Sequence, residues 1–180
     1  AEFPHSGPPE VTVLLATHQR RDVLLECLEG FSRQLVRPGE LELVVIDDGS
    51  TDGTPELTEV LALPVPCTFL RHERAGGASR ARVLGLPHAR GRLVLFVNDD
   101  TLPFPDTVRR HLEAHASLAP RQVAVLGTFE QPPEHLRNAL MRLLETSHHV
   151  FGYHGLRPGD ELDGSYFYTC NVSVDREAVH

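Results

Sequence analysis

The stretch LVLFVNDDTLPFP (residues 93–105) places two adjacent carboxylates, Asp99 and Asp100, directly after a run of large apolar side chains. An unbroken apolar run of this length is typical of a strand buried on both faces of a parallel sheet. Adjacent carboxylates repel each other, and partial burial raises the pKa of at least one of them unless a positive charge lies nearby. The stretch therefore predicts a buried strand whose end holds a cation.

Three further apolar strands precede this one, and helical periodicity follows each of the four. Thr54 is a suitable N-cap for the second helix, with Pro55 at its first position. Such alternation indicates right-handed βαβ units, and hence an α/β, Rossmann-like, mostly parallel sheet with helices on both faces. The predicted strands are 11–17, 41–47, 66–72 and 92–97, and the predicted helices are 20–35, 54–63, 78–89 and 105–119.

Polar clusters follow three of these strands, and ligands bind at the carboxyl ends of the strands in open parallel sheets. The oxygens of Asn98, Asp99 and Asp100 suit Mg²⁺ or Mn²⁺, ions that also bind substrate phosphates. Asp47 and Asp48, after the second strand, can accept hydrogen bonds from a ribose hydroxyl or a base N–H. One such acidic pair is more often a turn or a helix cap. Two pairs at one edge of the sheet favour a binding site.

The pattern changes from about Gln122 onward. We expect a strand over 122–130, a long helix over 132–149, a final strand over 166–174 and the start of a helix over 175–180. Between the long helix and the last strand, the glycine-rich loop 151–165 is the best candidate for a mobile segment.

Composition restricts the class of protein. The chain has 180 residues, 41% of them hydrophobic, and a net charge of -8, so we expect one folded domain that does not bind nucleic acid. All 17 basic residues are arginine, which excludes a lysine Schiff base or a P-loop lysine. Three cysteines suggest free thiols in a reducing compartment. Neither a secretory signal nor an apolar run of ~18 residues is visible, so we expect a cytoplasmic protein, with peripheral membrane attachment as the alternative.

Five segments resemble the inverting family 2 glycosyltransferases, whose fold is called GT-A. The similarity covers nearly the whole chain from Val11, and the joint occurrence of IDDGSTDGT and a distal FVNDDT is its specific part. The resemblance implies a nucleoside-diphosphate sugar donor, a hydroxyl acceptor on a saccharide, lipid or other molecule, and Mg²⁺ or Mn²⁺ as cofactor. The similar segments are VTVLLATHQRRDVLLECLEGF, VVIDDGSTDGT, GGASRARVLGL, GRLVLFVNDDTLPFP and YFYTCNVSVDREAV.

The resemblance also implies roles for matching residues. Asp100 would hold the metal ion on the diphosphate, with Asn98 in the place of the first acid of the family's DXD motif. That replacement lowers the charge of the metal site. Arg82 would approach the nucleotide or support the acidic edge, whereas Arg80 is expected on a solvated helix face. The residues expected to bind the nucleotide sugar are Thr17, His18 (in place of an aromatic contact to the base), Asp47, Asp48, Arg82 and Asp99.

The general base of the reaction has no assigned residue in this sequence. In the family it lies in an acidic segment beyond the last strand, and the chain ends at His180 before such a segment. We therefore expect a truncated piece of a longer enzyme, with residues 1–10 as a linker or cloning remnant, a nucleotide-binding half over 11–104 and an incomplete acceptor side over 105–180. The alternative is a base from the loop, namely Asp160, Glu161 or Asp163.

Other functions compete with this one. A zinc site is suggested by His111 and His115 at ligand spacing on one helix, but Leu112 stands where a metalloprotease needs glutamate, so a solvated helix face is favoured. A second histidine group, His148, His149 and His154, is expected at the surface. A dehydrogenase is disfavoured because ATHQRR lacks the G-x-G-x-x-G turn. A nucleotide-sugar-binding module without catalysis, or an inactive fragment, remains the main alternative.

Overall fold

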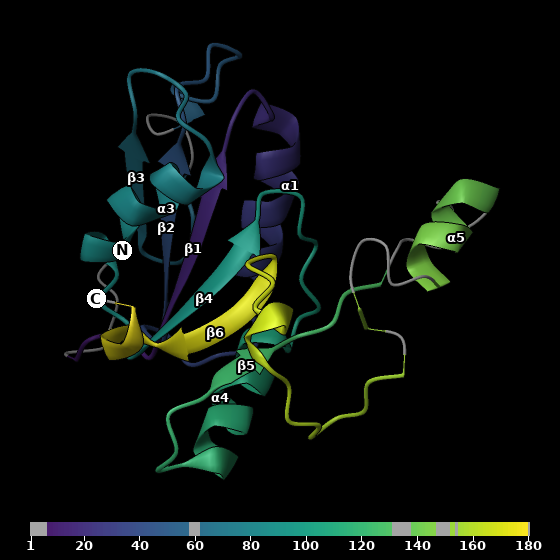
Figure 1. The fold of residues 1–180 in the computed structure, drawn as a ribbon. Coiled ribbons are helices and arrows are strands. Elements are labelled where there is room, and N and C mark those ends of the chain that lie inside the picture. The colour runs from purple at the N-terminus through teal and green to yellow at the C-terminus, as the bar shows by residue number, and fades with distance from the viewer. Residues whose placement is uncertain (1–6, 58–61, 131–137, 147–151, 154, 180) are drawn as a thin grey trace.

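The computed structural model describes residues 7–57, 62–130, 138–146, 152–153 and 155–179. Its centre is a six-stranded sheet in the order β3-β2-β1-β4-β6-β5 (Figure 1). The first four strands in that order are mutually parallel, and β6 pairs antiparallel with both β4 and β5. The strands are β1 (Val11–Thr17), β2 (Leu41–Asp47), β3 (Cys67–Arg71), β4 (Leu93–Asn98), β5 (Ala124–Leu126) and β6 (Asn171–Asp175).

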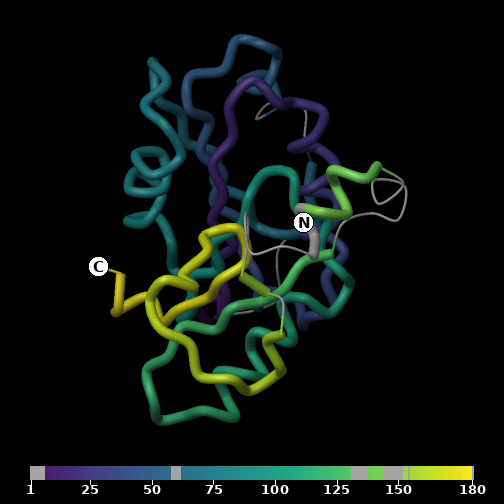
Figure 2. Tube along the Cα trace, turned by 45° about the vertical axis from the view of Figure 1, so that its right-hand side comes forward, coloured from purple at the N-terminus to yellow at the C-terminus, as the bar shows by residue number. Residues whose placement is uncertain are grey.

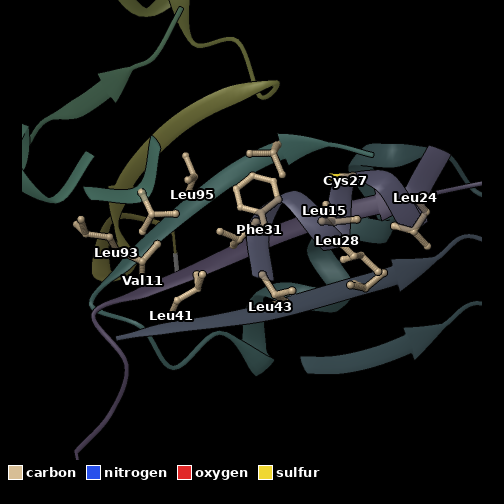
Figure 3. Packing of buried hydrophobic residues seen from close by; sticks show 14 of the residues in the cluster. Val11, Leu15, Leu24, Cys27, Leu28, Phe31, Leu41, Leu43, Leu93 and Leu95 are labelled. Carbon is tan, nitrogen blue, oxygen red and sulfur yellow. The ribbon is translucent and has the colours of Figure 1, made fainter. Parts of the chain in front are cut away.

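One face of the sheet is covered by α1 (Arg21–Ser32), with α4 (Thr107–Leu118) contributing Val108. Residues spaced three or four apart place one apolar stripe of α1 on the strands, and its largest member, Phe31, is fully buried. Figure 3 shows Phe31 and Leu28 lying between the side chains of β1, β2 and β4. This layer is the larger of the two apolar cores.

The opposite face is covered by α3 (Ala78–Gly85). Alternate strand residues point to this side, so Leu14 and Ile46 pack beneath α3 while their neighbours face α1. The helix lies close to the sheet, since a Cβ built on Gly85 would be 2.5 Å from Cδ1 of Ile46. Helices therefore cover both faces, as the sequence predicts.

A polar clamp joins the amino ends of the parallel strands, at the edge of the sheet opposite Asp47 and Asp99. Glu42 is buried, and its carboxylate accepts hydrogen bonds from Thr12 Oγ1 at 2.6 Å and from the Arg90 backbone N–H at 2.7 Å. The backbone N–H of Gly91 in turn donates to Thr12 Oγ1 at 2.9 Å. These contacts satisfy a carboxylate that would be costly to bury alone.

The strands over 11–17 and 41–47 are confirmed at both ends. The third helix ends at Gly85 and continues as a 3₁₀ turn, η1 (Leu86–His88), because proline cannot continue an α-helix. The predicted helix over 54–63 falls partly outside the described residues, which show a turn over 54–56 and a helical residue at 57.

The later elements are shorter than predicted. The fifth strand has three residues, and the final strand begins at Asn171 rather than 166, after the 3₁₀ turn η3 (Gly164–Tyr166). Residues 176–178 form a 3₁₀ turn, η4, rather than an α-helix. Of the long helix, the described part is α5 (Ala139–Thr146), which stands away from the sheet in Figure 1 and lies at the right-hand side of the trace in Figure 2. The mobility of loop 151–165 stays a prediction.

Within the described parts of the chain, every helix is too short or too polar to cross a bilayer.

Candidate functional site

The carboxyl ends of β2, β1 and β4 lie side by side and bring the two acidic segments to one edge. Thr17 is paired with Asp47 in the register of β1 and β2, and Ala16 with Asn98 in that of β1 and β4. Thr17 Oγ1 then donates to Asp99 Oδ2 at 2.8 Å. Thr17 therefore lies between the acidic groups that follow β2 and β4.

Arg20, directly before α1, is the positive charge at the end of β4. Its NH1 lies 2.8 Å from Asp99 Oδ1 and 3.2 Å from Asp100 Oδ2. The proximity of Asp99, more than that of Asp100, raises the pKa of Arg20. The cation that the sequence demands here is thus supplied by the chain itself. Sequence reasoning missed this residue, although ATHQR sits at the same strand-end edge.

Arg82 of α3 reaches the same edge from the face of the sheet opposite α1. Its NH2 donates to Asn98 Oδ1 at 3.1 Å and to the Thr169 carbonyl at 3.3 Å, while its buried Nε has no hydrogen-bond partner among the described residues. Burial lowers the pKa of Arg82. Of the two roles implied for this residue, these contacts correspond to support of the strand end.

Asp47 and Asp48 are both buried but differ in their free hydrogen-bonding capacity. Asp47 Oδ1 accepts from the Ser50 backbone N–H at 2.9 Å. Its Oδ2 has an ion pair with Arg71 Nε at 3.4 Å but no hydrogen bond among the described residues. A buried carboxylate oxygen without a hydrogen bond is unusual and is well suited to accept one from a ligand.

Asp48 instead ties the loop before α3 to the end of β2. Its carboxylate accepts from the backbone N–H groups of Gly76 at 2.9 Å and Gly77 at 2.7 Å, and lies 2.9 Å from His72 Nδ1. Burial alone would raise the pKa of Asp48, but the hydrogen bonds from His72 and the two glycines together lower it. The adjoining Gly49 has φ +75°, and any Cβ there would lie 2.8 Å from the Ala75 nitrogen.

His18 is exposed at the rim of this edge, and its Nδ1 lies 2.8 Å from the Asp48 carbonyl oxygen. Nδ1 must be the donor in this contact, because a carbonyl oxygen only accepts. The hydrogen bond fixes the ring while leaving its outer face accessible. Arg80 is exposed, as predicted.

The three loop acids proposed as alternative bases make local contacts. Asp160 accepts from the Arg157 backbone N–H at 2.7 Å, Asp163 caps η3 through the Ser165 N–H at 2.8 Å, and Glu161 pairs with Arg121 at 2.9 Å. All three are exposed. None is shown in contact with the acidic edge in the described structure, and the assignment of a base stays a prediction.

The solvated helix face expected for His111 and His115 is wrong, because both side chains are buried between α4 and β6. Ser173 Oγ lies 2.8 Å from His111 Nδ1 and 2.9 Å from His115 Nε2, and Asn171 Oδ1 lies 3.0 Å from His111 Nε2. Asn171 Nδ2 donates to the Thr128 carbonyl, so its oxygen accepts from His111 Nε2–H. The pair is therefore a satisfied polar core.

Among the described residues, none completes a zinc site with His111 and His115. Within the described ranges, no group of three or more histidine, cysteine or acidic residues is placed to hold a metal ion. The other histidines considered, His148, His149 and His154, lie outside the described residues.

Several relatives in sequence are named as glycosyltransferases. The profile described as "Glycosyl transferase family 2" matches residues 12–177. The succinoglycan biosynthesis protein ExoO of Rhizobium meliloti (strain 1021) is 35% identical over 119 residues, which cover 65% of this chain and 32% of that protein. The validoxylamine A glucosyltransferase of Streptomyces hygroscopicus subsp. limoneus is 30% identical over 141 residues, covering 78% and 31%. The chain thus spans about a third of the length of these relatives.

Solved structures show the same fold. The mannosyltransferase PcManGT from Pyrobaculum calidifontis, in complex with GDP-Man and Mn²⁺, has a TM-score of 0.60 and 28% identity, covering 69% of this chain and 37% of its own. The S. aureus TarS fragment 1-349 in complex with UDP-GlcNAc also has a TM-score of 0.60, at 23% identity, covering 72% and 38%. The fold is therefore GT-A, as the sequence resemblance implies.

Proposed function

The chain belongs to glycosyl transferase family 2, and we propose that it is the glycosyltransferase domain, incomplete on its acceptor side, of a metal-dependent, inverting enzyme. In this proposal a sugar passes from a nucleoside diphosphate to an acceptor hydroxyl. Residues 11–104 bind the donor and residues 105–180 form part of the acceptor side. The relative named as a glucosyltransferase and the structural relative with GDP-Man and Mn²⁺ support this reaction class.

The observation that carries the proposal is the buried Oδ2 of Asp47, which has no hydrogen bond in the described structure. A base N–H or a ribose hydroxyl would donate a hydrogen bond to this oxygen, and a ligand lacking the donor would leave it without one, at a cost of about 1–3 kcal/mol. Thr17 and the exposed ring of His18 lie at the same edge. Asp48 shapes the neighbouring loop, and we propose that it acts on the nucleoside through that loop.

The residues at the end of β4 fit a divalent ion bound together with a diphosphate. Asp100 offers a hard oxygen donor whose side chain is 49% exposed, and Asn98 offers an amide oxygen that Arg82 already contacts. Two protein ligands are few, but Mg²⁺ and Mn²⁺ sites are commonly completed by water and substrate phosphates. A bound ion would stabilise the charge that develops on the departing diphosphate.

The chain's own residues then position the donor. Thr17 and Arg20 hold the Asp99 carboxylate in one orientation, so that it can accept hydrogen bonds from the sugar or ribose at a fixed place. Direct attack by the acceptor oxygen on the anomeric carbon inverts its configuration without an enzyme nucleophile. A carboxylate that removes the acceptor's proton would add about 10² to 10⁴ in rate.

Calorimetry with UDP and GDP, each with Mn²⁺ or with EDTA, tests this proposal. We expect Asp100→Asn to remove the metal-dependent part of the affinity and Asp47→Asn to weaken nucleoside binding in EDTA as well. Asp22→Asn, which removes a carboxylate with an 88% exposed side chain on α1, is the matched control. Parent-like, metal-dependent binding by Asp100→Asn would refute the metal assignment. Binding with no sugar transfer, even in a chain extended to the length of its relatives, would favour the non-catalytic module.

A further inference from the structure

We propose that Arg20 is a resident cation for the acidic end of β4, and that it must release Asp100 before a divalent ion can bind there. The inference rests on the proposed function, because it takes Asp100 as a metal ligand. Neither the similarity to the DXD motif nor the position of the polar clusters after the strands gives Arg20 a role. Its consequence is that metal binding and the Arg20–Asp100 ion pair exclude each other.

The two carboxylates hold Arg20 unequally. One guanidinium nitrogen, NH1, lies 2.8 Å from Asp99 and 3.2 Å from Asp100. The Asp99 side chain is 7% exposed and Asp100 is 49% exposed. Asp99 is fixed further, because its second oxygen accepts from Thr17. The longer contact to the more exposed partner is therefore the one that can open while the pair with Asp99 persists.

The main chain at Arg20 is held in place while its side chain is half-exposed. The Arg20 carbonyl accepts the first hydrogen bond of α1 from Leu24 N–H at 2.9 Å, and the preceding Gln19 N–H donates to Ser50 Oγ at 2.9 Å. The Arg20 side chain itself is 48% exposed. Leaving Asp100 therefore requires rotation of a side chain and no rearrangement of the sheet edge.

This arrangement links the metal to the donor through charge. A guanidinium within ion-pair distance of Asp100 repels an ion that approaches the same carboxylate, so Arg20 lowers the affinity of the nucleotide-free chain for metal. A diphosphate offers oxygens that arginine binds in a bidentate manner, so a donor can take the guanidinium from Asp100. Nucleotide and metal should then raise each other's affinity by the same factor.

The test measures the affinity for Mn²⁺ at low ionic strength. The electron paramagnetic resonance signal of the free ion serves as the readout of binding. Without nucleotide, Arg20→Gln should bind Mn²⁺ roughly two- to tenfold more tightly than the parent, because a partly exposed ion pair and a nearby charge are removed. Arg33→Gln makes the same change in net charge directly after α1, where the Arg33 side chain is 75% exposed, and should leave the affinity unchanged. Arg20→Lys keeps a positive charge and should stay near the parent.

Adding UDP completes the experiment. We expect UDP to raise the Mn²⁺ affinity of the parent by a larger factor than that of Arg20→Gln. Equal or weaker Mn²⁺ binding by folded Arg20→Gln overturns the inference, and so does tighter binding by Arg20→Lys to the same extent as Arg20→Gln. Asp100→Asn separates the two proposals. If it abolishes Mn²⁺ binding while Arg20→Gln gains nothing, only the inference fails, whereas unchanged binding by Asp100→Asn means that the metal assignment fails as well.

Discussion

Lowering the pH should destabilise this chain through His111, and replacing that residue should remove the effect. Burial, more than the neighbouring His115, lowers the pKa of His111 from 6.5 to about 4. In the unfolded chain the imidazole returns to its ordinary pKa, so between these two values the unfolded state binds more protons. The contribution of His111 to stability is therefore constant above pH 6.5, falls as the pH drops from 6.5 to 4, and stops falling below 4.

The size of the effect follows from the width of that window. Each pH unit below 6.5 costs about 1.36 kcal/mol, so at pH 5 the loss through His111 is about 2 kcal/mol. That is a large part of the free energy of unfolding of a small domain, which is about 5–15 kcal/mol. Burial lowers the pKa of His111 by more than the hydrogen bond to Asn171 raises it.

Urea unfolding at pH 7.5, 6 and 5 measures this loss. His111→Gln keeps an amide donor for Asn171 but does not titrate, so its stability should fall by about 2 kcal/mol less than the parent's between pH 7.5 and 5. His88→Gln, at an exposed histidine of η1, is the control and should follow the parent. An equally steep fall in His111→Gln would refute the reasoning.

Two further predictions concern packing and reactivity. A Cβ on Gly91 would meet the backbone of Thr12, which cannot move aside, whereas one on Gly85 would meet the terminal methyl group of the Ile46 side chain, which can shift by rotation. Thermal unfolding should therefore show that Gly91→Ala lowers the stability of the parent by more than about 2 kcal/mol and that Gly85→Ala lowers it less. The reverse order would contradict the close packing of Gly91 on Thr12. Burial raises the pKa of Cys27 to about 12, so a thiol reagent at pH 8 should label it only after unfolding. Rapid labelling of the native chain would contradict that.

The parallel part of the fold follows from the sequence because burial on both faces leaves a pattern that is hard to mistake. The runs over 11–17 and 41–47 contain few polar residues, and both strands begin and end where the pattern does. The short β5 and the 3₁₀ turn before β6 leave no such mark. In that region the chain follows contacts with α4 and the sheet, which local sequence does not encode.

The position of the candidate site was also predictable, but the partners within it were not. Because the strands are parallel, their carboxyl ends bring Asp47 and Asp99 to one edge of the sheet, where Thr17 lies between them. That Arg20 would neutralise Asp99, and that Asp48 would face a backbone loop, depends on side-chain directions that one sequence does not give. The burial of His111 and His115 was not predicted for a similar reason. Helical spacing shows that the two residues share a face of the helix but not which element covers that face.

The reversed direction of β6 has an evolutionary consequence. Because β6 runs antiparallel to β4, Asn171 at its start lies beside Val97, near the carboxyl end of β4. The chain that leads into β6 arrives there from outside the parallel sheet. Arg82 holds the segment before β6 in place by a hydrogen bond to the Thr169 carbonyl. Insertions or deletions ahead of this anchor would remodel the rim without shifting the register of β1, β2 or β4. If the proposed function holds, one donor-binding half could in this way diversify toward many acceptors.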